Sequence, residues 1–326
     1  MPETAISVVM GVYNGAPRLA QTIESVLAQT CGDFEFLIIN DGSTDRQVAA
    51  ILAAYAARDA RMAIVNKHNE GLTVALAEGC RRARGAYIAR IDVGDVMAPE
   101  RLSAQKAVLD AHPGCHLVSC AVSFHGPDWE ELWVNRGRPA TVEPVTVLSE
   151  RDGDGLQADI PHHGSVMFRR SAYAAAGGYR PAFYYGQDWD LWYRLAEAGS
   201  FCVVPRVLYR ARFFPDAISM AQSQRQQCIA QLSLAAHQLR KRGLPDLAVV
   251  SRAQAFRPSR SAADRERGGS AAGYYFIGEA LRRRGNPECR AYFLQAIKGR
   301  PWSLKSWLRL LQSTRLRGSR DSVAEW

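Results

Sequence analysis

Short apolar runs alternate with segments of helical periodicity along the first hundred residues. The apolar runs, each of strand length, are Ile6–Val12, Phe34–Asn40, Met62–Val65 and Tyr87–Ile91. The segments with helical spacing are Arg18–Gln29, Arg46–Ala57, Leu72–Ala83 and Glu100–Asp110. Repeated strand–helix units of this length predict an α/β fold, with a mostly parallel sheet covered by helices on both faces.

The pattern becomes less regular between residues 115 and 216. The expected elements there are a strand at Leu117–Phe124, a polar loop at Glu143–Asp159, a strand at Ser165–Phe168, a helix at Trp189–Ala198, and extended segments at Phe201–Val204 and Leu208–Phe213. No convincing strand follows Ile218, so a boundary is expected near Asp216. The sequence predicts an α/β domain over 1–216 and a helical region over 217–326.

The region 217–326 contains helical segments separated by turn residues. A helix is expected at Cys228–Leu239 and a linker at Pro258–Gly269. Two further helices flank Gly285-Asn286-Pro287 and resemble one tetratricopeptide-type helix pair near 271–301. A single unit of that type does not bury its own apolar face, so another part of the chain must cover it.

Charge divides the chain at the same place. Residues 1–216 hold 21 Lys and Arg against 25 Asp and Glu, whereas residues 217–326 hold 20 against 7, a net charge of +13. Such a region suggests an anionic partner, either a membrane surface, a nucleic acid or an acidic polymer, or else a solvated Arg-rich helical face. Its arginines are not interleaved with aromatic residues, which disfavours nucleic acid.

The chain shows no feature of a membrane-spanning or disulfide-stabilised protein. Its longest stretch without a charged residue, Ala111–Pro127, has 17 residues and includes three His and two Pro. The N-terminus lacks a positive segment before its apolar run, which argues against a secretion signal. Seven scattered cysteines without a close C-x-x-C pair fit a reducing compartment and argue against a zinc site. A cytoplasmic location is expected.

Polar residues follow three of the expected strands. They are Tyr13-Asn14, Asp41-Gly42-Ser43 and Asp92-Val93-Gly94-Asp95. Ligands of an open parallel sheet bind at this edge. The chain has neither a G-x-G-x-x-G nor a G-x-x-x-x-G-K-[ST] motif, so carboxylates remain to hold a base or ribose, or a divalent cation that binds phosphates.

Four segments in order resemble the family-2 glycosyltransferases. They read SVVMGVYNG, SVLAQT-x3-FEFLIINDGSTD, NEGLTVALAEGCRRARGAYIARIDVGDVMAPERLSAQ and GQDWDLWYRLAEAG, and the resemblance covers roughly residues 6–216. The chain resembles the bacterial inverting enzymes of that family, which have the GT-A fold and use nucleotide-activated sugars. The resemblance therefore implies a GT-A-type sheet and a nucleotide-sugar substrate, with UDP as the expected nucleotide.

The resemblance assigns roles in nucleotide-sugar binding to six residues, one of which is Asp92. Tyr13 matches a tyrosine beside the base, and Asp41 matches an aspartate that hydrogen-bonds the uracil edge. Gly71 and Leu72 match a loop that closes over the base, and Arg90 is expected to order the carboxylates that follow it. Structural alternatives are a turn aromatic for Tyr13, a helix N-cap or Asx-turn for Asp41, and a helix start for Gly71 and Leu72.

The segment that begins at Asp92 matches the family's Asp-x-Asp-Asp motif with one departure. Asp92 and Asp95 are retained as expected ligands of Mn²⁺ or Mg²⁺, but Gly94 replaces the central Asp, which is usually the principal ligand. The loss implies that Asp95 takes over the metal, that water fills the gap, or that metal dependence is weakened.

The resemblance also assigns the catalytic base. Asp188 matches the base of the family's Glu-Asp pair, with Gln187 in place of the Glu. Asp190 points away from Asp188 on a helix and is not expected to share the role. His163 and Ser165 match a loop near the acceptor and the pyrophosphate.

The implied activity is transfer of one sugar per encounter to a glycan or lipid-linked acceptor in bacterial surface polysaccharide synthesis. Processive members add a Gln-x-x-Arg-Trp motif, and Gln224-Arg225 lacks the Trp. The alternative is a nucleotide-sugar-binding protein whose catalysis is weakened, with Gly94 as its signature.

An apolar stripe in the basic region allows two interpretations. Leu304, Trp307, Leu308 and Leu311 recur with helical spacing, and Trp302 precedes them. Among cationic residues such a stripe is typical of a helix at a membrane interface. Alternatively, it caps the helix pair by packing against Tyr274, Leu281 and Phe293.

Overall fold

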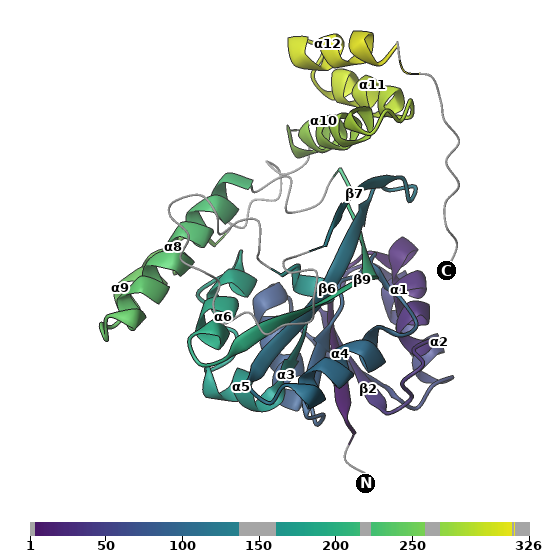
Figure 1. Ribbon diagram of the computed structural model, residues 1–326. Coiled ribbons are helices and arrows are strands. Elements are labelled where there is room, and N and C mark those ends of the chain that lie inside the picture. The colour runs from purple at the N-terminus through teal and green to yellow at the C-terminus, as the bar shows by residue number, and fades with distance from the viewer. Residues whose placement is uncertain (1–3, 137–160, 216–222, 258–267, 315, 317–326) are drawn as a thin grey trace. The chain divides into compact units, whose positions relative to one another are not determined.

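The computed structural model describes residues 4–136, 161–215, 223–257, 268–314 and 316 (Figure 1). The expected loop at 143–159, the boundary residue Asp216 and most of the expected linker at 258–269 lie outside this range. The chain forms two compact units. The first comprises Met1–Val122, Arg136–Arg210 and Cys228–Arg257, and the second comprises Ser123–Asn135, Ala211–Gln227 and Pro258–Trp326.

One nine-stranded mixed sheet is present in the described residues. Its strands are β1 (Ile6–Val12), β2 (Phe34–Asp41), β3 (Met62–Lys67), β4 (Tyr87–Arg90), β5 (Val96–Met97), β6 (Cys115–His125), β7 (Glu131–Asn135), β8 (Met167–Arg169) and β9 (Ser200–Arg212). Their order is β3-β2-β1-β4-β8-β6-β9-β5, with β7 paired to β6. Strands β1 to β4 pair in parallel, whereas β8 pairs antiparallel to both β4 and β6, and β5 antiparallel to β9.

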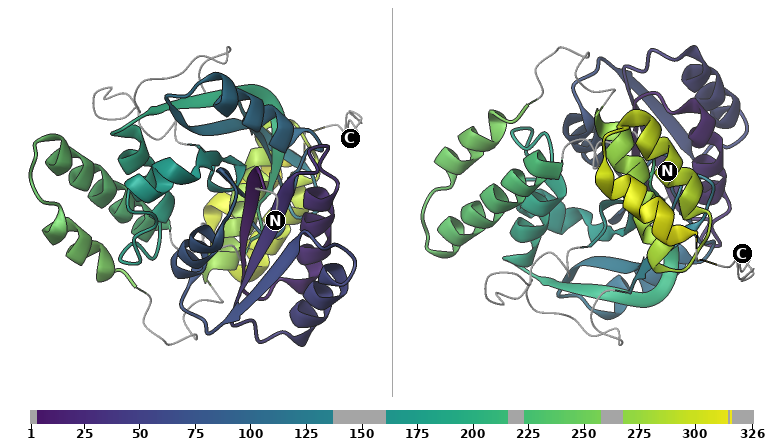
Figure 2. Two further views of the ribbon diagram at one scale, coloured as in Figure 1. Left: turned by 90° about the horizontal axis from the view of Figure 1, so that it is seen from below. Right: turned by 90° about the horizontal axis from the view of Figure 1, so that it is seen from above.

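Helices cover both faces of the parallel part of the sheet (Figure 2). The helices of the first unit are α1 (Ala16–Leu27), α2 (Arg46–Ala56), α3 (Leu72–Arg82), α4 (Arg101–Ala111), α5 (Arg170–Ala175), α6 (Gln187–Ala196), α8 (Ser223–Lys241) and α9 (Leu247–Gln254), of which α8 begins in the second unit. The alternation predicted for the first hundred residues is confirmed. Strands β5 and β7 and helices α5 and α9 were not predicted, because each is short and has no strong apolar period.

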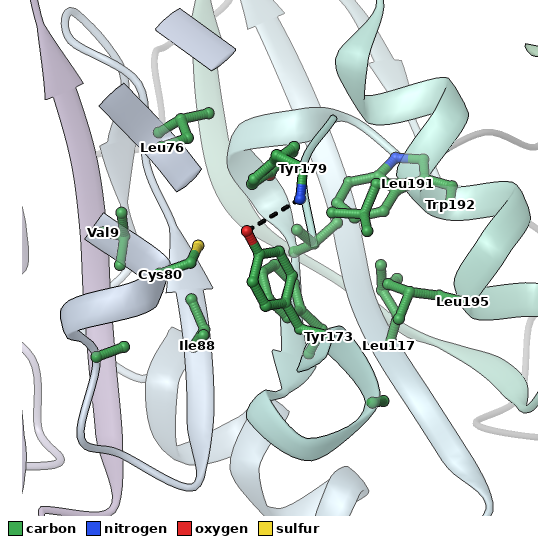
Figure 3. Close-up of a cluster of buried hydrophobic side chains, with 14 of the residues drawn as sticks. Val9, Leu76, Cys80, Ile88, Leu117, Tyr173, Tyr179, Leu191, Trp192 and Leu195 are labelled. Atoms are coloured by element: carbon green, nitrogen blue, oxygen red, sulfur yellow. Dashed lines mark hydrogen bonds between the residues drawn. The ribbon is translucent and has the colours of Figure 1, made fainter. Parts of the chain in front are cut away.

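A buried cluster joins the sheet to α6 (Figure 3). It includes side chains of β1, β4 and α3 (Val9, Ile88, Leu76 and Cys80) together with Leu191, Trp192 and Leu195 of α6. Tyr173 and Tyr179 lie between these groups, and the Tyr173 hydroxyl accepts a 3.0 Å hydrogen bond from the Tyr179 backbone N–H. Since α6 packs its apolar side into this cluster, the direction of the side chains in its first turn is fixed.

Helices α8 and α9 belong with the first unit, although the sequence placed them in the C-terminal region. Their apolar residues pack with Phe183 and Tyr185, which precede α6; the buried members of α8 and α9 are Ile229, Leu232, Ala236, Val249 and Ala253. The Arg180 guanidinium also donates to Asp246 just before α9, at 2.8 Å. Tertiary packing therefore places these helices against the segment 179–186.

Three helices make up most of the described second unit: α10 (Gly268–Arg283), α11 (Cys289–Gly299) and α12 (Leu304–Ser313). Helices α10 and α11 pack against each other around Ile277, Leu281 and Phe293, and Leu132 of β7 joins the same cluster. Helix α12 packs next to α11 (Figure 1). Within the part of the chain that the structure describes, no helix is long and apolar enough to cross a membrane.

Candidate active site

Asp41 organises the loop that follows β3. Asp41 is 3% exposed at the end of β2. Its Oδ1 accepts hydrogen bonds from Lys67 Nζ at 2.8 Å and from the Glu70 backbone N–H at 3.0 Å, and its Oδ2 accepts from the Gly71 N–H at 2.8 Å. Asp45, not Asp41, caps α2. The buried carboxylate thus shapes the predicted base-covering loop, and its contact with a uracil edge stays a prediction.

Tyr13 lies at the end of the neighbouring strand β1. Its side chain is 54% exposed, which is unusual for an aromatic residue next to a buried strand. The following residue, Asn14, accepts hydrogen bonds through its Oδ1 from the backbone N–H groups of Thr44 and Asp45, at 3.0 and 3.1 Å. Tyr13 and Asp41 are therefore brought to the same sheet edge, with the Tyr13 ring available to a planar ligand.

The loop at Gly71 touches the segment that leads to α6. Gly71 has φ 96°, a backbone conformation that residues other than glycine rarely adopt. A Cβ at this position would lie 2.5 Å from Tyr184 Cε2. Thr73 Oγ1 donates to the Phe183 carbonyl at 2.8 Å. Leu72 is 38% exposed and packs over Gly11, where a Cβ would lie 2.9 Å from Leu72 Cδ1. The predicted base-covering loop is therefore in direct contact with segment 179–186, which leads into α6.

Arg90 is fully buried and hydrogen-bonds the acidic segment, as expected. Its guanidinium donates to Asp92 Oδ1 at 2.6 Å and to the carbonyls of Val9 and Ile91. Burial is the largest single influence and would raise the pKa of Asp92, but the charge and hydrogen bond of Arg90 together with the neighbouring His163 and His162 hold that pKa below its usual value. Asp92, with a side chain 32% exposed, is therefore a carboxylate held in the charged state at the surface of the site.

Asp95 points away from solvent and binds protein groups. It is 6% exposed, and its Oδ2 accepts a 2.7 Å hydrogen bond from the Tyr209 hydroxyl. Thr22 connects the same turn to α1, since its Oγ1 donates to the Asp95 carbonyl at 2.8 Å and accepts from the Gly94 N–H at 2.9 Å. Gly94 has φ 99°, so the local backbone suits glycine and disfavours the aspartate usual at this position.

These contacts limit what the acidic segment can hold. Of the two predicted metal ligands, Asp92 has an exposed edge and Asp95 is buried against Tyr209. Among the described residues, no group of three His, Cys, Asp or Glu side chains is arranged to hold a metal ion. The donor set does not fit a cation held by the protein alone, because hard divalent cations require six or more oxygens.

His163 and Ser165 lie in a buried turn beside Asp92. His163 Nε2 makes a 2.7 Å hydrogen bond with the Tyr179 hydroxyl, and Ser165 Oγ donates to the His162 carbonyl at 2.9 Å. Burial lowers the pKa of His163 to about 3 and that of His162 to about 4, so both rings are neutral near pH 7. A Cβ on Gly164 would collide with the Tyr209 hydroxyl and lie 3.2 Å from Asp92 Oδ2. The turn therefore lies directly against the Asp92 carboxylate, and the Ser165 side chain is buried in the protein interior.

Asp188 occupies the first turn of α6 and is partly exposed. Its pKa is raised to about 6, mainly by burial; the charge of Asp92 adds to the rise, and local backbone N–H groups and Arg90 oppose it. The structure therefore brings Asp188 into the electrostatic field of Asp92 and Arg90. A carboxylate with a pKa near 6 is deprotonated at neutral pH but basic enough to accept a proton.

Asp190 has a different environment two residues further along α6. It is fully buried, and its carboxylate accepts hydrogen bonds from the guanidinium groups of Arg180 and Arg194. Arg180 also reaches Asp246, which Arg240 contacts in turn. Asp190 is thus committed to an ionic network that ties α6 to α8 and α9.

Several residues of the site carried no signal in the sequence. Tyr209 comes from β9, Tyr184 from the segment just before α6, and Arg101 from α4, where it lies inside a quoted motif without an assigned role. Arg101 is fully buried and donates to the Arg90 carbonyl at 2.9 Å and to the Val166 carbonyl at 3.0 Å. An arginine inside a helical pattern looks like a solvated residue, and only the fold shows that it braces the strand of Arg90.

The comparisons with known proteins agree with this arrangement. The sequence model of the family described as "Glycosyl transferase family 2" matches residues 7–177. EpsE of Bacillus subtilis (strain 168), named a glycosyltransferase, is 35% identical over 202 residues, which are 60% of this chain and 67% of that protein. The amylovoran biosynthesis glycosyltransferase AmsE of Erwinia amylovora is 26% identical over 217 residues, covering 65% of this chain and 78% of its own.

A solved structure has the same fold over most of the chain. Staphylococcal TarS 1-349, crystallised in complex with UDP-GlcNAc ("S. aureus TarS 1-349"), superposes with a TM-score of 0.59 at 14% identity, covering 95% of this chain and 91% of that chain. This likeness confirms the predicted GT-A-type mixed sheet with C-terminal helices. Because the family model covers more than half of its length, the chain belongs to glycosyltransferase family 2 and is a glycosyltransferase.

Proposed function

We propose that this enzyme transfers a sugar from a UDP-linked donor to a glycan or lipid-linked acceptor with inversion at the anomeric carbon. The observation that carries the proposal is Asp188, a partly exposed carboxylate in the first turn of α6 whose pKa of about 6 is influenced by the charges of Asp92 and Arg90. Inversion requires one carboxylate that accepts the proton of the acceptor hydroxyl and no enzyme nucleophile that attacks the sugar. Asp188 can supply that base, and the neighbouring Asp190 does not compete because it is paired with Arg180 and Arg194.

In the proposed step the protein contributes only side-chain and backbone groups of this chain, which act on the bound acceptor and donor. The acceptor hydroxyl oxygen attacks the anomeric carbon as Asp188 removes its proton. The bond between that carbon and the diphosphate oxygen breaks, and the nucleotide diphosphate leaves with the electron pair. Tyr13 and the loop held by Asp41 position the nucleotide, and Asp92 and His163 line the reacting end.

The donor and the setting come from the relatives. TarS is described in complex with UDP-GlcNAc, and AmsE is named for amylovoran biosynthesis. We therefore infer a UDP-sugar donor and a role in surface polysaccharide assembly. The absence of a Gln-x-x-Arg-Trp sequence in the chain supports transfer of one sugar per encounter. The same proposal places the enzyme in the cytoplasm, peripherally at the inner face of the membrane, where lipid-linked acceptors lie.

A divalent cation enters the proposal only as a ligand of the nucleotide. Since Asp95 is bound to Tyr209, we propose that Mn²⁺ or Mg²⁺ binds weakly and together with UDP, with Asp92 as the contact from the protein. Calorimetry with Mn²⁺ in the presence and absence of UDP tests this. Tight binding of Mn²⁺ to the protein alone would contradict it.

The second candidate function is a nucleotide-sugar-binding protein with weakened catalysis, favoured by Gly94 in place of a metal-ligating Asp. A panel of nucleotide sugars distinguishes the two. Thermal stabilisation by a UDP-sugar with release of UDP supports the transferase. Stabilisation without turnover, in the presence of Mn²⁺ and a cell extract rich in lipid-linked glycans, supports the binding protein.

A further inference from the structure

Helix α12 exposes its apolar side. The exposed fractions of its large apolar residues and of the Trp before it are 80% for Trp302, 83% for Leu304, 50% for Trp307, 52% for Leu308 and 68% for Leu311. These five residues, the α12 stripe, are among the most exposed large apolar residues of the described chain. Contiguous exposed apolar surface of this kind marks an interaction site in folded proteins.

The opposite, more polar side of α12 is the one that packs. Ser306 is 2% exposed and Ser313 is fully buried. Arg290 of α11 donates to the Ser313 carbonyl at 2.8 Å, and Leu310 joins the cluster around Leu281 and Phe293. Since that cluster does not include the α12 stripe, the structure contradicts the interpretation in which the stripe caps the helix pair.

Exposed basic residues accompany the stripe. Residues 289–314 contain no Asp or Glu and five basic residues, Arg290, Lys298, Arg300, Lys305 and Arg309. Lys298, Arg300 and Lys305 are exposed. Arg309 is paired with Glu279 of α10, and Arg290 donates to the Ser313 carbonyl on the packed side of α12. The three exposed basic residues therefore add positive charge near the start of the apolar stripe.

We propose that the α12 stripe docks on an anionic lipid surface, with its Trp and Leu side chains in the headgroup region and the basic residues against the phosphates. Trp and Leu next to Lys and Arg are the composition of helices that lie in such an interface. A second copy of the chain fits less well, because pairing the stripe with itself would bring two sets of like charges together. The docking refines the proposed peripheral position and does not depend on sugar transfer.

The experiment is co-sedimentation of the full chain with vesicles, without nucleotide sugar. At low salt, binding to vesicles of phosphatidylcholine with phosphatidylglycerol should exceed binding to phosphatidylcholine alone by about a hundredfold, and high salt should remove most of the difference. Trp emission should shift to shorter wavelength on binding.

Two variants and a matched control locate the surface. Leu308→Ser with Leu311→Ser should reduce vesicle binding about tenfold or more, and Lys298→Glu with Lys305→Glu should remove the preference for phosphatidylglycerol. Leu247→Ser is the control, because Leu247 of α9 is 73% exposed and lies outside the stripe. It should leave binding unchanged.

Three outcomes would overturn the inference. The intact chain stays in the supernatant with anionic vesicles at low salt, or the stripe variant sediments as well as the Leu247→Ser control. Alternatively, sedimentation velocity shows a dimer that the stripe variant lacks, and the stripe is then a contact between copies. Transfer to a soluble acceptor should be equal in all variants, so failure of docking is distinguishable from failure of the proposed transfer.

Discussion

Helices α6 and α12 have ten residues each and both are strongly amphipathic, yet α6 buries its apolar side and α12 buries its polar side. Helix α6 buries Leu191, Trp192 and Leu195, whereas the residues that α12 buries are serines. Helix α6 even buries an aspartate, which two arginines neutralise. The difference teaches that an amphipathic pattern fixes a helix and its two sides, while the neighbours available in the fold decide which side turns inward.

The largest effect is expected at Asp188, the partly exposed carboxylate of α6. Asp188→Asn should lower the rate of transfer by about 10² to 10⁴, because the acceptor hydroxyl loses its base. UDP affinity should stay the same, since Asn keeps the shape of the side chain and the nucleotide loop lies elsewhere. Steady-state kinetics with calorimetry of UDP checks this. Wild-type transfer by the variant would remove Asp188 from the mechanism.

The buried carboxylate of the same helix should respond in stability instead. Asp190→Asn removes the carboxylate that pairs with Arg194 and one of the two that pair with Arg180, and should lower the free energy of unfolding by about 3 to 5 kcal/mol. Urea titration measures the loss. The folded fraction should retain more transfer activity than Asp188→Asn; a reversed order of the two activities would contradict the division of roles.

Matched leucines compare the two helices directly. Leu191→Ala removes a fully buried side chain of α6 and should cost about 2 to 5 kcal/mol of stability. Leu308→Ala removes a half-exposed side chain of α12 and should change stability by about 0.5 kcal/mol or less. Thermal and urea unfolding of the full chain test both. An equally large loss at Leu308 would mean that the α12 stripe is covered by protein.

A moderate effect on stability concerns the proton of Asp188. Its pKa of about 6 in the folded chain lies above the ordinary value of 3.8, so the folded state holds this proton more tightly than the unfolded state. The resulting cost in stability is absent below about pH 4 and fully present above about pH 6. Asp188→Asn removes it and should be more stable than wild type by about 1 to 3 kcal/mol at pH 7.

The pH dependence is measured as the difference in unfolding free energy between variant and wild type, followed from pH 4 to pH 7. That difference should grow with pH. In parallel, kcat/KM of the wild type should rise through about pH 6 as the base loses its proton. A difference that stays constant with pH would show that the pKa of Asp188 is not raised.

The sequence alone determined the local elements and the family. Apolar runs and helical periods predicted the first four strands and helices, because the hydrophobic pattern of each element lies within one continuous segment of the sequence. The motifs around Asp41, Asp92 and Asp188 indicated glycosyltransferase family 2, since these carboxylates lie in recognisable segments. The loss of a central Asp at Gly94 was also visible, although its backbone conformation, φ 99°, was not.

Tertiary structure alone decided which residues meet and which surfaces remain uncovered. The contacts of Tyr209 with Asp95 and of Tyr184 with Gly71 join positions more than a hundred residues apart, and no local pattern encodes them. Packing against Phe183 drew α8 and α9 into the first unit. The side that α12 buries was decided likewise, because burial depends on the neighbours that folding supplies and not on the period of the helix.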